Sequence, residues 1–497
     1  MAVVVRSGVM QGVDAIPIEV EVDLLRRLPS VCIVGLPASA VRESAERIRS
    51  AIEGADEPFP RRRVVVNLAP ADVKKEGTVL DLPMALGILA AAERVPVEAV
   101  SSVLAVGELS LGGVLRPIRG ALSLALLARR LGLSLLLPRA SASVAALVPE
   151  VEIVGASTLS EALAWLRGER VLPRAEPAPI CEEHTTRDLS EVRGQQVPRW
   201  ALEIAAAGAH HLLLIGPPGC GKSMLAARLP SILPPLTFEE ALATTRIHSA
   251  AGLLDDARVL RSRPFRAPHH SVTVAGLVGD RRLRPGEISL AHNGVLFLDE
   301  APEFRRAGIE VLRQPLEEGR IQLSRAQGTI EYPAAITLVM AANPCPCGMR
   351  GAGCCGCTDA DVARYLRRLS GPILDRVDLH VQVQPIDSRE LLGGPRGEDS
   401  ATVRARVIAA RERQQARGQR VPNGRLPPSE VARVAALRAD AQEILASSAH
   451  RHGLSGRATT RIIKVARTLA DLDGDGGVSE RHVARALAFR PSLDLWG

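Results

Sequence analysis

Short apolar runs alternate with amphipathic stretches along the first third of this 497-residue chain. The runs MAVVVRS, IPIEVEVDL and RRRVVVNLAP have strand character, and SAVRESAERIRSAIEGA and DLPMALGILAAAERV have helical periodicity. This alternation predicts a mixed α/β domain over residues 1–172. The stretch PRAEPAPICEEHTTRD comes next, and its content of Pro, Glu and Thr predicts an exposed linker over residues 173–187.

The middle of the chain has a different pattern, in which continuous apolar runs are separated by helical stretches. The runs are HLLLIG, GVLFLDE and AAITLVMAAN, and this succession is the βαβ pattern of a parallel sheet. We therefore expect an α/β core over residues 188–395. Beyond the Gly- and Pro-rich segment LLGGPRGEDS the helical period continues almost to the end, so residues 396–497 are expected to form a helical lid.

Composition narrows the class of protein. Apolar residues make up 46% of the chain and aromatic residues 2%, as in a globular protein rather than a disordered one. The run ALSLALLARRLGLSLLLP is interrupted by arginine before it reaches the roughly 18 to 20 residues of a membrane span. The N-terminus is too quickly polar for a signal peptide. We expect a cytoplasmic protein without a membrane partner.

The net charge of +7 favours a polyanionic partner such as nucleic acid, with a general solubility charge as the alternative.

A phosphate-binding loop follows the first core strand. The sequence HLLLIGPPGCGKSML matches G-x-x-x-x-G-K-[ST] between a predicted strand and a predicted helix. Backbone N–H groups of such a loop surround phosphates, the lysine reaches the β- and γ-phosphates of ATP, and the serine hydroxyl binds Mg²⁺. The expected ATP-binding residues are Gly216, Pro217, Pro218, Gly219, Cys220, Gly221, Lys222, Ser223 and Met224.

Two further strands end in polar residues that complete this chemistry. GVLFLDE places Asp299, which is expected to hold Mg²⁺ through water, and Glu300, which is expected to polarise the attacking water. AAITLVMAAN ends in Asn343, which is expected to position water beside the γ-phosphate. An Asn at a strand end is also a common turn former. The set predicts an ATPase that needs ATP and Mg²⁺.

Several long motifs carry a family resemblance that covers nearly the whole chain. RPFRAPHHS, RPGEISLAHNGVLFLDEAPEF, RQPLEEGRIQLSRA and NPCPCG resemble the YifB/ComM family of magnesium-chelatase-like AAA+ ATPases. The resemblance implies an N-terminal ChlI domain related to the Lon protease fold, a P-loop AAA+ core with a parallel sheet, and a C-terminal helical lid.

The same resemblance implies a homo-oligomer, expected to be a hexameric ring, that acts on branched or single-stranded DNA. Its implied role is a helicase or translocase promoting branch migration in recombination during natural transformation. The alternative is a magnesium-chelatase-like ATPase that remodels a protein partner, which fold similarity alone does not separate from a DNA motor. The domain that precedes the core and the basic net charge both favour the DNA motor over the protein-remodelling ATPase.

Two arginines are expected to complete the ATP site by this resemblance. Arg376 in LDRVDLH lies where related ATPases carry the arginine finger that acts on a neighbour's nucleotide, and Arg457 in SGRATTR lies at the sensor-2 position of the lid. A surface ion pair is the alternative for each, and Arg461 competes with Arg457 for the sensor-2 role.

The N-terminal domain lacks the residues of a Ser–Lys protease. Alignment of KEGTVLDL with the protease motif puts Val79 at the position of the nucleophile, and VLRPIRGAL has no lysine at the partner position. Such a hydrolase needs a hydroxyl and an adjacent base. We expect an inactive domain that serves as a scaffold or DNA-binding platform.

A cysteine cluster follows Asn343 closely. NPCPCGMRGAGCCGC offers Cys345, Cys347, Cys355 and Cys357 as two C-x-C pairs, with Cys354 in excess. Four thiolates can hold a structural Zn²⁺ tetrahedrally, although C-x-C spacing is less typical than C-x-x-C. A glycine-rich loop of reduced thiols is the alternative.

EGRIQLSRAQGTIEYP predicts a hairpin between Asp299 and Asn343, with Arg320 and Arg325 exposed near its turn. In related ring helicases a hairpin at this point projects into the central pore, where arginines could contact DNA phosphates. An ordinary solvated turn is the alternative.

His269 and His270 in RPFRAPHHS are adjacent. In an extended segment they would point to opposite faces, which predicts a poor pair for one metal ion.

Overall fold

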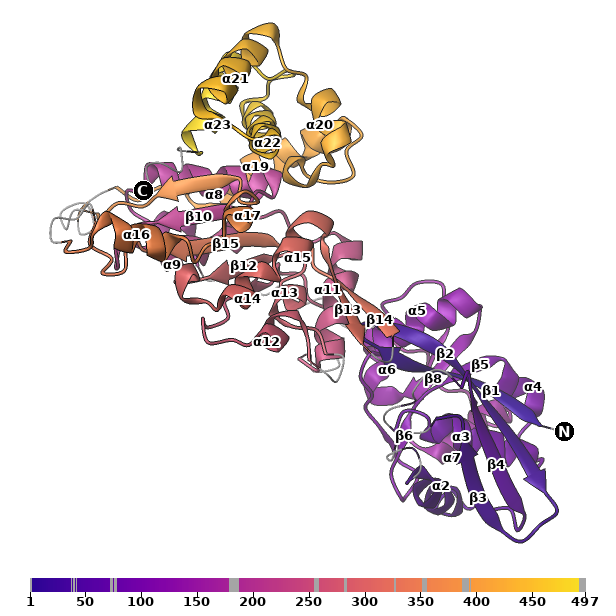
Figure 1. Cartoon of the computed structure of the whole chain (residues 1–497). Coiled ribbons are helices and arrows are strands. Elements are labelled where there is room, and N and C mark those ends of the chain that lie inside the picture. The colour runs from indigo at the N-terminus through magenta and orange to yellow at the C-terminus, as the bar shows by residue number, and fades with distance from the viewer. Residues whose placement is uncertain are drawn as a thin grey trace.

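The computed structural model describes residues 2–36, 38, 41, 43–71, 75, 78–177, 187–253, 259–280, 284–325, 328–350, 355–386, 393 and 395–490. For residues 324, 325, 328 and 329 it describes the backbone alone. Figure 1 shows three blocks in a row, with the N-terminal domain at one end, the α/β core in the middle and the helical lid at the other end. The α/β fold class expected from the sequence is confirmed.

The N-terminal domain is built on a seven-stranded mixed sheet in the order β3-β4-β2-β1-β5-β8-β9. Strands β1, β2 and β4 pair in antiparallel fashion, and β1, β5, β8 and β9 run parallel. The strands are β1 (Val3–Gln11), β2 (Asp14–Leu25), β3 (Ser30–Val34), β4 (Arg63–Ala69), β5 (Val103–Ala105), β8 (Ser134–Pro138) and β9 (Ile153–Ala156), with a small ladder of β6 (Glu108–Leu109) and β7 (Leu115–Arg116).

Helices cover this sheet and bury its apolar side chains. They are α2 (Ser44–Glu53), α3 (Asp81–Ala91), α4 (Val97–Ser101), α5 (Ala121–Leu131), α6 (Arg139–Ala145) and α7 (Leu159–Leu166). Helix α3 packs against β1 and β2, and ten of its eleven residues are buried. Val79 is partly buried and packs against both apolar clusters of the domain.

The core contains a five-stranded sheet in the order β11-β12-β15-β10-β16, in which all strands run parallel. Its strands are β10 (Leu212–Ile215), β11 (Phe265–Arg266), β12 (Val295–Leu298), β15 (Thr337–Ala342) and β16 (Leu379–Gln382). Strands β10, β12 and β15 are buried at every position, which explains why they are continuous apolar runs.

Short helices surround the core sheet. They are η1 (Leu189–Glu191), α8 (Gln196–Gly208), α9 (Lys222–Ala226), α10 (Leu229–Ile232), α11 (Phe238–Ala251), α12 (Val274–Val278), α13 (Glu287–Leu290), η2 (Ala301–Glu303), α14 (Arg306–Glu310), α15 (Arg313–Glu318), α16 (Asp359–Leu366) and α17 (Gly371–Leu374). The hairpin of β13 (Arg320–Arg325) and β14 (Gly328–Pro333) leaves the core between β12 and β15, as the sequence predicts.

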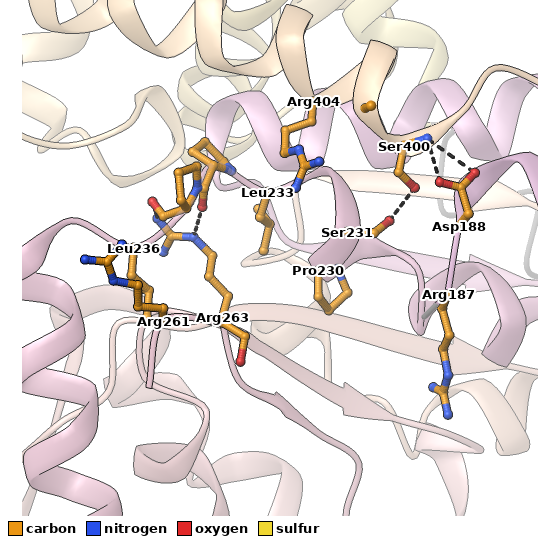
Figure 2. A pocket seen from close by; sticks show the side chains of 14 residues that line it. Arg187, Asp188, Pro230, Ser231, Leu233, Leu236, Arg261, Arg263, Ser400 and Arg404 are labelled. Carbon is orange, nitrogen blue, oxygen red and sulfur yellow. Dashed lines mark hydrogen bonds between the residues drawn. The ribbon is translucent and has the colours of Figure 1, made fainter. Parts of the chain in front are cut away.

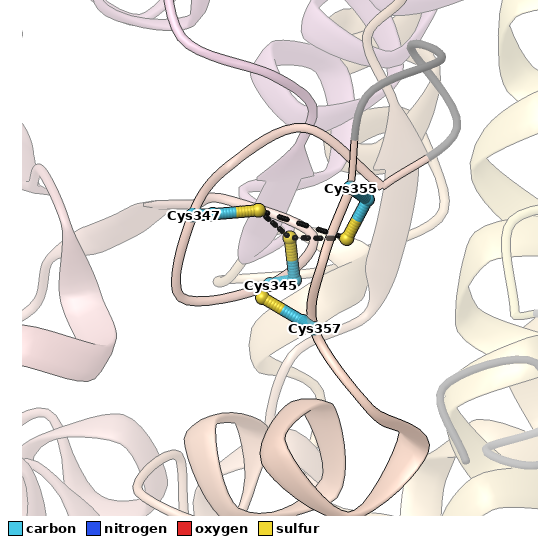
Figure 3. A group of neighbouring side chains, drawn as sticks. All are labelled: Cys345, Cys347, Cys355 and Cys357. Atoms are coloured by element: carbon cyan, nitrogen blue, oxygen red, sulfur yellow. Dashed lines mark hydrogen bonds between the residues drawn. The ribbon is translucent and has the colours of Figure 1, made fainter.

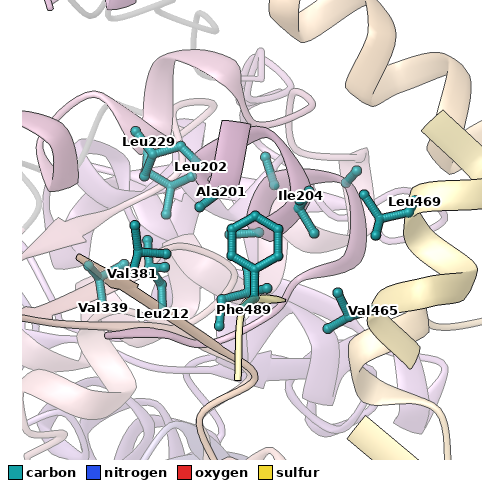
Figure 4. Packing of buried hydrophobic residues seen from close by; sticks show 14 of the residues in the cluster. Ala201, Leu202, Ile204, Leu212, Leu229, Val339, Val381, Val465, Leu469 and Phe489 are labelled. Atoms are coloured by element: carbon teal, nitrogen blue, oxygen red, sulfur yellow. The ribbon is translucent and has the colours of Figure 1, made fainter. Parts of the chain in front are cut away.

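The lid consists of α19 (Ser400–Ala416), η3 (Asn423–Arg425), α20 (Pro428–Ala435), α21 (Ala439–His452), α22 (Gly456–Asp473) and α23 (Glu480–Ala488). It shares one apolar cluster with the core. Phe489, directly after α23, is 3% exposed and lies among side chains of α8 and of the core sheet, close to Leu469 of α22 (Figure 4). The lid is therefore anchored to the core by buried apolar contacts.

The N-terminal domain contacts the core at the hairpin. The turn between β1 and β2 lies against β14, where a Cβ on Gly12 would meet Ile330 at 2.7 Å and Tyr332 at 3.2 Å. Val13 belongs to the same apolar cluster as Ile330 and Tyr332, and Arg246 of α11 donates to the Val13 carbonyl. The hairpin root thus packs against two domains.

The predicted linker is described at its beginning, where Arg174 forms an isolated bridge with Val154 of β9. Residues 178–186 lie outside the described residues.

Candidate active site

Three neighbouring strands bring the expected catalytic residues to one edge of the core sheet. The P-loop follows β10, the Asp299–Glu300 pair follows β12, and Asn343 follows β15. These strands are adjacent and parallel in the order β12-β15-β10, so their carboxyl ends meet at this edge. Ligands of open α/β sheets bind at such edges.

The backbone of the P-loop requires glycine at two places. Gly221 has a φ of +92°, a value that side chains rarely adopt. A Cβ on Gly216 would lie 2.1 Å from the carbonyl oxygen of Val383, so only glycine fits between the loop and the segment after β16.

Lys222 occupies the centre of the loop. Its Nζ donates to the carbonyl oxygens of Gly216 and Pro217 at 2.6 and 2.8 Å, and to Oδ1 of Asn343 at 3.1 Å. The side chain is 9% exposed, and these oxygens hold the ammonium in the place where the P-loop lysine serves phosphate oxygens. Lys222 and Asn343 are therefore in direct contact in the folded chain.

Ser223 and Asp299 are joined by a hydrogen bond between their side chains. The Ser223 hydroxyl donates to Oδ2 of Asp299 at 2.7 Å, while Oδ1 of Asp299 accepts the backbone N–H of Glu300 at 3.0 Å. A hydroxyl and a carboxylate held at this distance are the two protein ligands that P-loop ATPases offer to Mg²⁺. The residues present fit the ion and the nucleotide.

Glu300 projects from a strained turn after β12. Its φ is +49° and its side chain is 54% exposed, so the carboxylate is open to water. Oε2 of Glu300 lies 3.6 Å from Nδ1 of His270. No sequence pattern indicates this contact, since it joins two loops that only the folded sheet brings together.

The expectation that His269 and His270 point to opposite faces is wrong. Their ring centroids lie 4.0 Å apart at an interplanar angle of 35°. The reason is local, because the chain forms a turn here rather than an extended segment, and Nδ1 of His269 contacts the Ser271 hydroxyl at 2.8 Å.

Arg376 is buried within its own subunit. Its guanidinium donates to Oε1 of Glu317 at 2.5 Å and to the Pro372 carbonyl at 2.6 Å, and its side chain is 8% exposed. Arg457, at the start of α22, is 67% exposed and lies 3.7 Å from the same carboxylate oxygen. Both arginines expected from the resemblance therefore converge on Glu317.

Arg461 has a different environment from Arg457. It donates to Oδ1 of Asp378 at 2.6 Å, and the backbone N–H of His211 donates to Oδ2 of the same carboxylate at 2.9 Å. Burial acts to raise the pKa of Asp378, but the charge of Arg461 and the contacts with His210 and His211 together outweigh it and hold that pKa well below the usual range. Arg461 thus joins the lid to the core sheet, while Arg457 stays accessible.

Four thiols converge directly after Asn343 (Figure 3). The Sγ atom of Cys345 lies 3.3 Å from that of Cys347 and 3.6 Å from that of Cys355, and Cys357 completes a group within 4.8 Å. The backbone N–H of Met349 lowers the pKa of Cys347 to about 6, which favours the thiolate. Cys354 lies outside the described residues.

This cysteine loop touches the P-loop. A Cβ on Gly348 would meet Cδ of Pro218 at 2.7 Å, so the two loops pack closely. Cys345 is fully buried, two residues after Asn343.

The hairpin differs from expectation in one respect. Arg320 does not lie near the turn, because β13 begins at this residue and pairs it with Pro333 at the opposite end. Its guanidinium contacts Glu318 at 3.1 Å and Glu331 at 2.9 Å. Arg325 does flank the turn, paired with Gly328, and its side chain lies outside the described residues.

A parallel sheet with a P-loop, a strand-end Asp–Glu pair, a neighbouring strand-end Asn and a helical lid define a AAA+ ATPase. Residues 188–391 match "Magnesium chelatase, subunit ChlI", residues 20–141 match "Subunit ChlI of Mg-chelatase", and residues 397–490 match the C-terminal part of that subunit. The chain belongs to the YifB/ComM family of magnesium-chelatase-like proteins.

Two relatives carry this assignment over nearly the full length. The protein YifB of Salmonella typhimurium is 42% identical over 490 residues, covering 98% of this chain and 96% of its own. Competence protein ComM of Haemophilus influenzae is 42% identical over 499 residues, covering 99% and 98%.

Among the helices of the described residues, none combines the length and apolar character that a membrane span requires.

Proposed function

We propose that this protein is a ring-forming motor, a homohexamer, that uses ATP hydrolysis to move DNA and promotes branch migration in recombination during natural transformation. The observation that carries the proposal is the place of the β13–β14 hairpin. It is inserted between β12, which ends in Asp299 and Glu300, and β15, which ends in Asn343. The hairpin is therefore connected through the chain to both strand ends, and a movement of either end can reach it over a short segment.

The hairpin root offers a rigid connection for such movement. Ile321 and Tyr332 are buried, and they belong to the same apolar cluster as Leu298 at the end of β12 and Met340 in β15. Close-packed side chains transmit displacement because the interior has little free volume. A change at the strand ends on hydrolysis would thus shift the hairpin, whose turn is flanked by Arg325.

Within the ATP site, each side chain has a proposed task. Lys222 binds the β- and γ-phosphates, Ser223 and Asp299 hold Mg²⁺, Glu300 orients the attacking water, and Asn343 positions Lys222 and that water. Bound Mg²⁺ would neutralise charge that develops on the phosphate oxygens.

Labelled three-way and four-way DNA junctions test the motor function. The protein with ATP should unwind or migrate the junction, and Lys222→Ala should not. Arg325→Ala should lower DNA affinity for all sequences alike and reduce the salt dependence of binding, while most basal ATPase activity remains. Arg433→Ala is the matched control, since Arg433 is an exposed lid arginine. A wild-type protein that neither binds nor unwinds any junction would refute the DNA function.

The second candidate is a motor that remodels a protein partner, as suggested by the magnesium chelatase matches over all three regions. This second function is favoured if ATPase activity is normal, DNA does not change the rate of ATP hydrolysis, and the protein binds no junction.

We also propose a structural Zn²⁺ held by Cys345, Cys347, Cys355 and Cys357. Zinc–sulfur bonds of about 2.3 Å in a tetrahedron place the sulfur atoms about 3.8 Å apart. The distances of 3.3 and 3.6 Å between Cys345 and its neighbours are close to this value. The ion would fix the loop that packs on Pro218 and would hold Asn343 in place.

A further inference from the structure

A cavity of about 370 Å³ lies between the core and the lid, far from the P-loop edge of the sheet. Its core wall is formed at the amino ends of the strands, by Ala209 before β10, Asn293 before β12 and Thr337 at the start of β15. The P-loop lies at the carboxyl ends of the same strands. The cavity is therefore separate from the proposed ATP site.

The charge of its lining is unbalanced. Four arginines and two glutamates line the cavity, namely Arg263, Arg411, Arg420, Arg425, Glu239 and Glu240. One of the two acids is already engaged, because Oε2 of Glu240 accepts from Arg263 at 2.9 Å. The lining thus holds more positive charge than its own acids neutralise.

The three inner arginines differ in how their guanidinium groups are satisfied. Arg263 donates to the carbonyl oxygens of Pro234 at 2.6 Å and Asn293 at 2.7 Å, in addition to Glu240. Arg411 donates to the Ala206 carbonyl near the end of α8 at 2.8 Å, while its Nε is buried without a partner among the residues that the structure describes. The Arg425 guanidinium makes no hydrogen bond or ion pair with any residue that the structure describes.

The electrostatic environment agrees with this geometry. Burial, and next the charge of Arg263, lower the pKa of Arg411 to about 9 and that of Arg425 to about 10. The same surroundings act on His292, where burial and then the charge of Arg425 lower the pKa to about 3. Positive charge is destabilised here, and an anion would relieve it.

We infer that this cavity is a binding site for a small phosphate-type oxyanion, with Arg425 and Arg411 as its principal ligands. Guanidinium forks match the oxygens of phosphate in number and direction. A cavity of this volume admits inorganic phosphate or pyrophosphate. Both principal ligands come from the lid, and Arg263 of the core, whose donors are engaged by Pro234, Asn293 and Glu240, adds positive charge to the cavity wall.

A neighbouring cavity, whose lining is drawn in Figure 2, shares four residues with this one, namely Arg263, Leu233, Pro234 and Pro235. Arg404 lines that second cavity, is exposed to solvent and does not line the first. It provides the matched control.

The test uses the full chain with Lys222→Ala, so that the P-loop does not account for phosphate binding. Inorganic phosphate and pyrophosphate are titrated by calorimetry, and thermal unfolding is followed with sodium chloride at equal ionic strength as the reference. AMP forms a further arm, which distinguishes a free anion from the phosphate of a nucleotide. The variants Arg425→Gln and Arg404→Gln are made in the same background.

We expect phosphate or pyrophosphate to raise Tm beyond the chloride reference, and Arg425→Gln to weaken binding at least tenfold. Without anion, Arg425→Gln should unfold at the same or a higher temperature than its parent, because it removes a partly buried charge that no described residue pairs and that Arg263 repels. Arg404→Gln should change neither value. Should Arg425→Gln fold poorly, Arg425→Lys keeps the charge, loses the fork, and should weaken binding by a smaller factor. Equal affinity in parent and Arg425 variants, or no anion effect beyond chloride, overturns the site.

Discussion

The guanidinium of Arg376 donates to the carboxylate of Glu317 at 2.5 Å within a single chain. Arg457 of the lid lies 3.7 Å from the same oxygen. If Arg376 serves the nucleotide of a neighbouring subunit, it has to leave Glu317 when the ring assembles, and Arg457 would then be the nearest cation for that carboxylate. One acid thus connects the proposed finger to the proposed sensor of the lid.

Arg376→Ala should inactivate the ATPase in trans. Mixing it with Lys222→Ala protein should restore part of the activity, because some interfaces then combine an intact P-loop with an intact Arg376. Steady-state ATPase rates of the mixture and of each variant alone provide the measurement, with mixed rings verified by differential tagging. Mixtures that form yet never exceed the separate variants would show that Arg376 does not act across the interface.

Lys222→Ala should abolish ATP turnover, since it removes the ammonium that the P-loop and Asn343 hold in place. Glu300→Gln should retain ATP binding and lose hydrolysis by about 100-fold or more, as expected for loss of a group that orients the attacking water. Nucleotide binding by fluorescence and phosphate release measure the two effects. The control is Glu303→Gln, a neighbouring acid that pairs with Arg368. A wild-type rate in either site variant would refute the assignment.

The purified protein should contain about one zinc ion per chain, and Cys345→Ser or Cys355→Ser should lose it. Zinc released by a thiol reagent and detected with a chromogenic chelator gives the stoichiometry. Cys32→Ser is the matched control, because Cys32 lies in β3 of the N-terminal domain. The loss should also slow ATP turnover, because the cysteine loop packs on the P-loop. Equal and negligible zinc in wild type and variants would leave the reduced-thiol loop as the correct interpretation.

Stability should fall in mild acid because of two buried histidines. Nδ1 of His211 accepts the N–H of Leu338 at 3.1 Å, and Nδ1 of His292 accepts the N–H of Ala335 at 3.0 Å. Burial lowers the pKa of each to about 3. The unfolded chain binds protons at these sites below a pKa of about 6.5, whereas the folded chain does not. Stability is therefore complete above that pH and is lost progressively as the pH falls toward 3.

From pH 7 to pH 5 each histidine should cost on the order of 2 kcal/mol of unfolding free energy. Thermal unfolding at the two pH values measures this, and His292→Asn, which keeps an acceptor near the Nδ1 position but does not titrate, should reduce the difference. His450→Asn on the exposed face of α21 should not. An unchanged pH dependence in His292→Asn would contradict the assignment.

The sequence predicted the strand ends well, and the physical reason is that they are local. Apolar runs mark β10, β12 and β15, and in a parallel sheet the residues after such runs meet at one edge. The P-loop glycines are likewise dictated by backbone geometry, as the φ of Gly221 illustrates.

Contacts between loops far apart in the chain were not predictable in this way. Glu317 precedes Arg376 by 59 positions, and His270 reaches Glu300 from another loop. The prediction that Arg320 lies near the turn was wrong for a simpler reason. The alternation of side chains does not determine where β13 begins, so the distance of Arg320 from the turn could not be predicted.

The packing of Gly12 and Val13 against Ile330 and Tyr332 has a consequence for how this protein can be divided. A fragment that begins at Asp188 would retain every residue of the proposed ATP site, yet its hairpin would lose the apolar cover that the β1–β2 turn supplies. The uncovered side chains of Ile330 and Tyr332 would then form an exposed apolar patch, the kind of surface that favours aggregation. The N-terminal domain thus shields apolar side chains of the hairpin that the isolated core would expose to water.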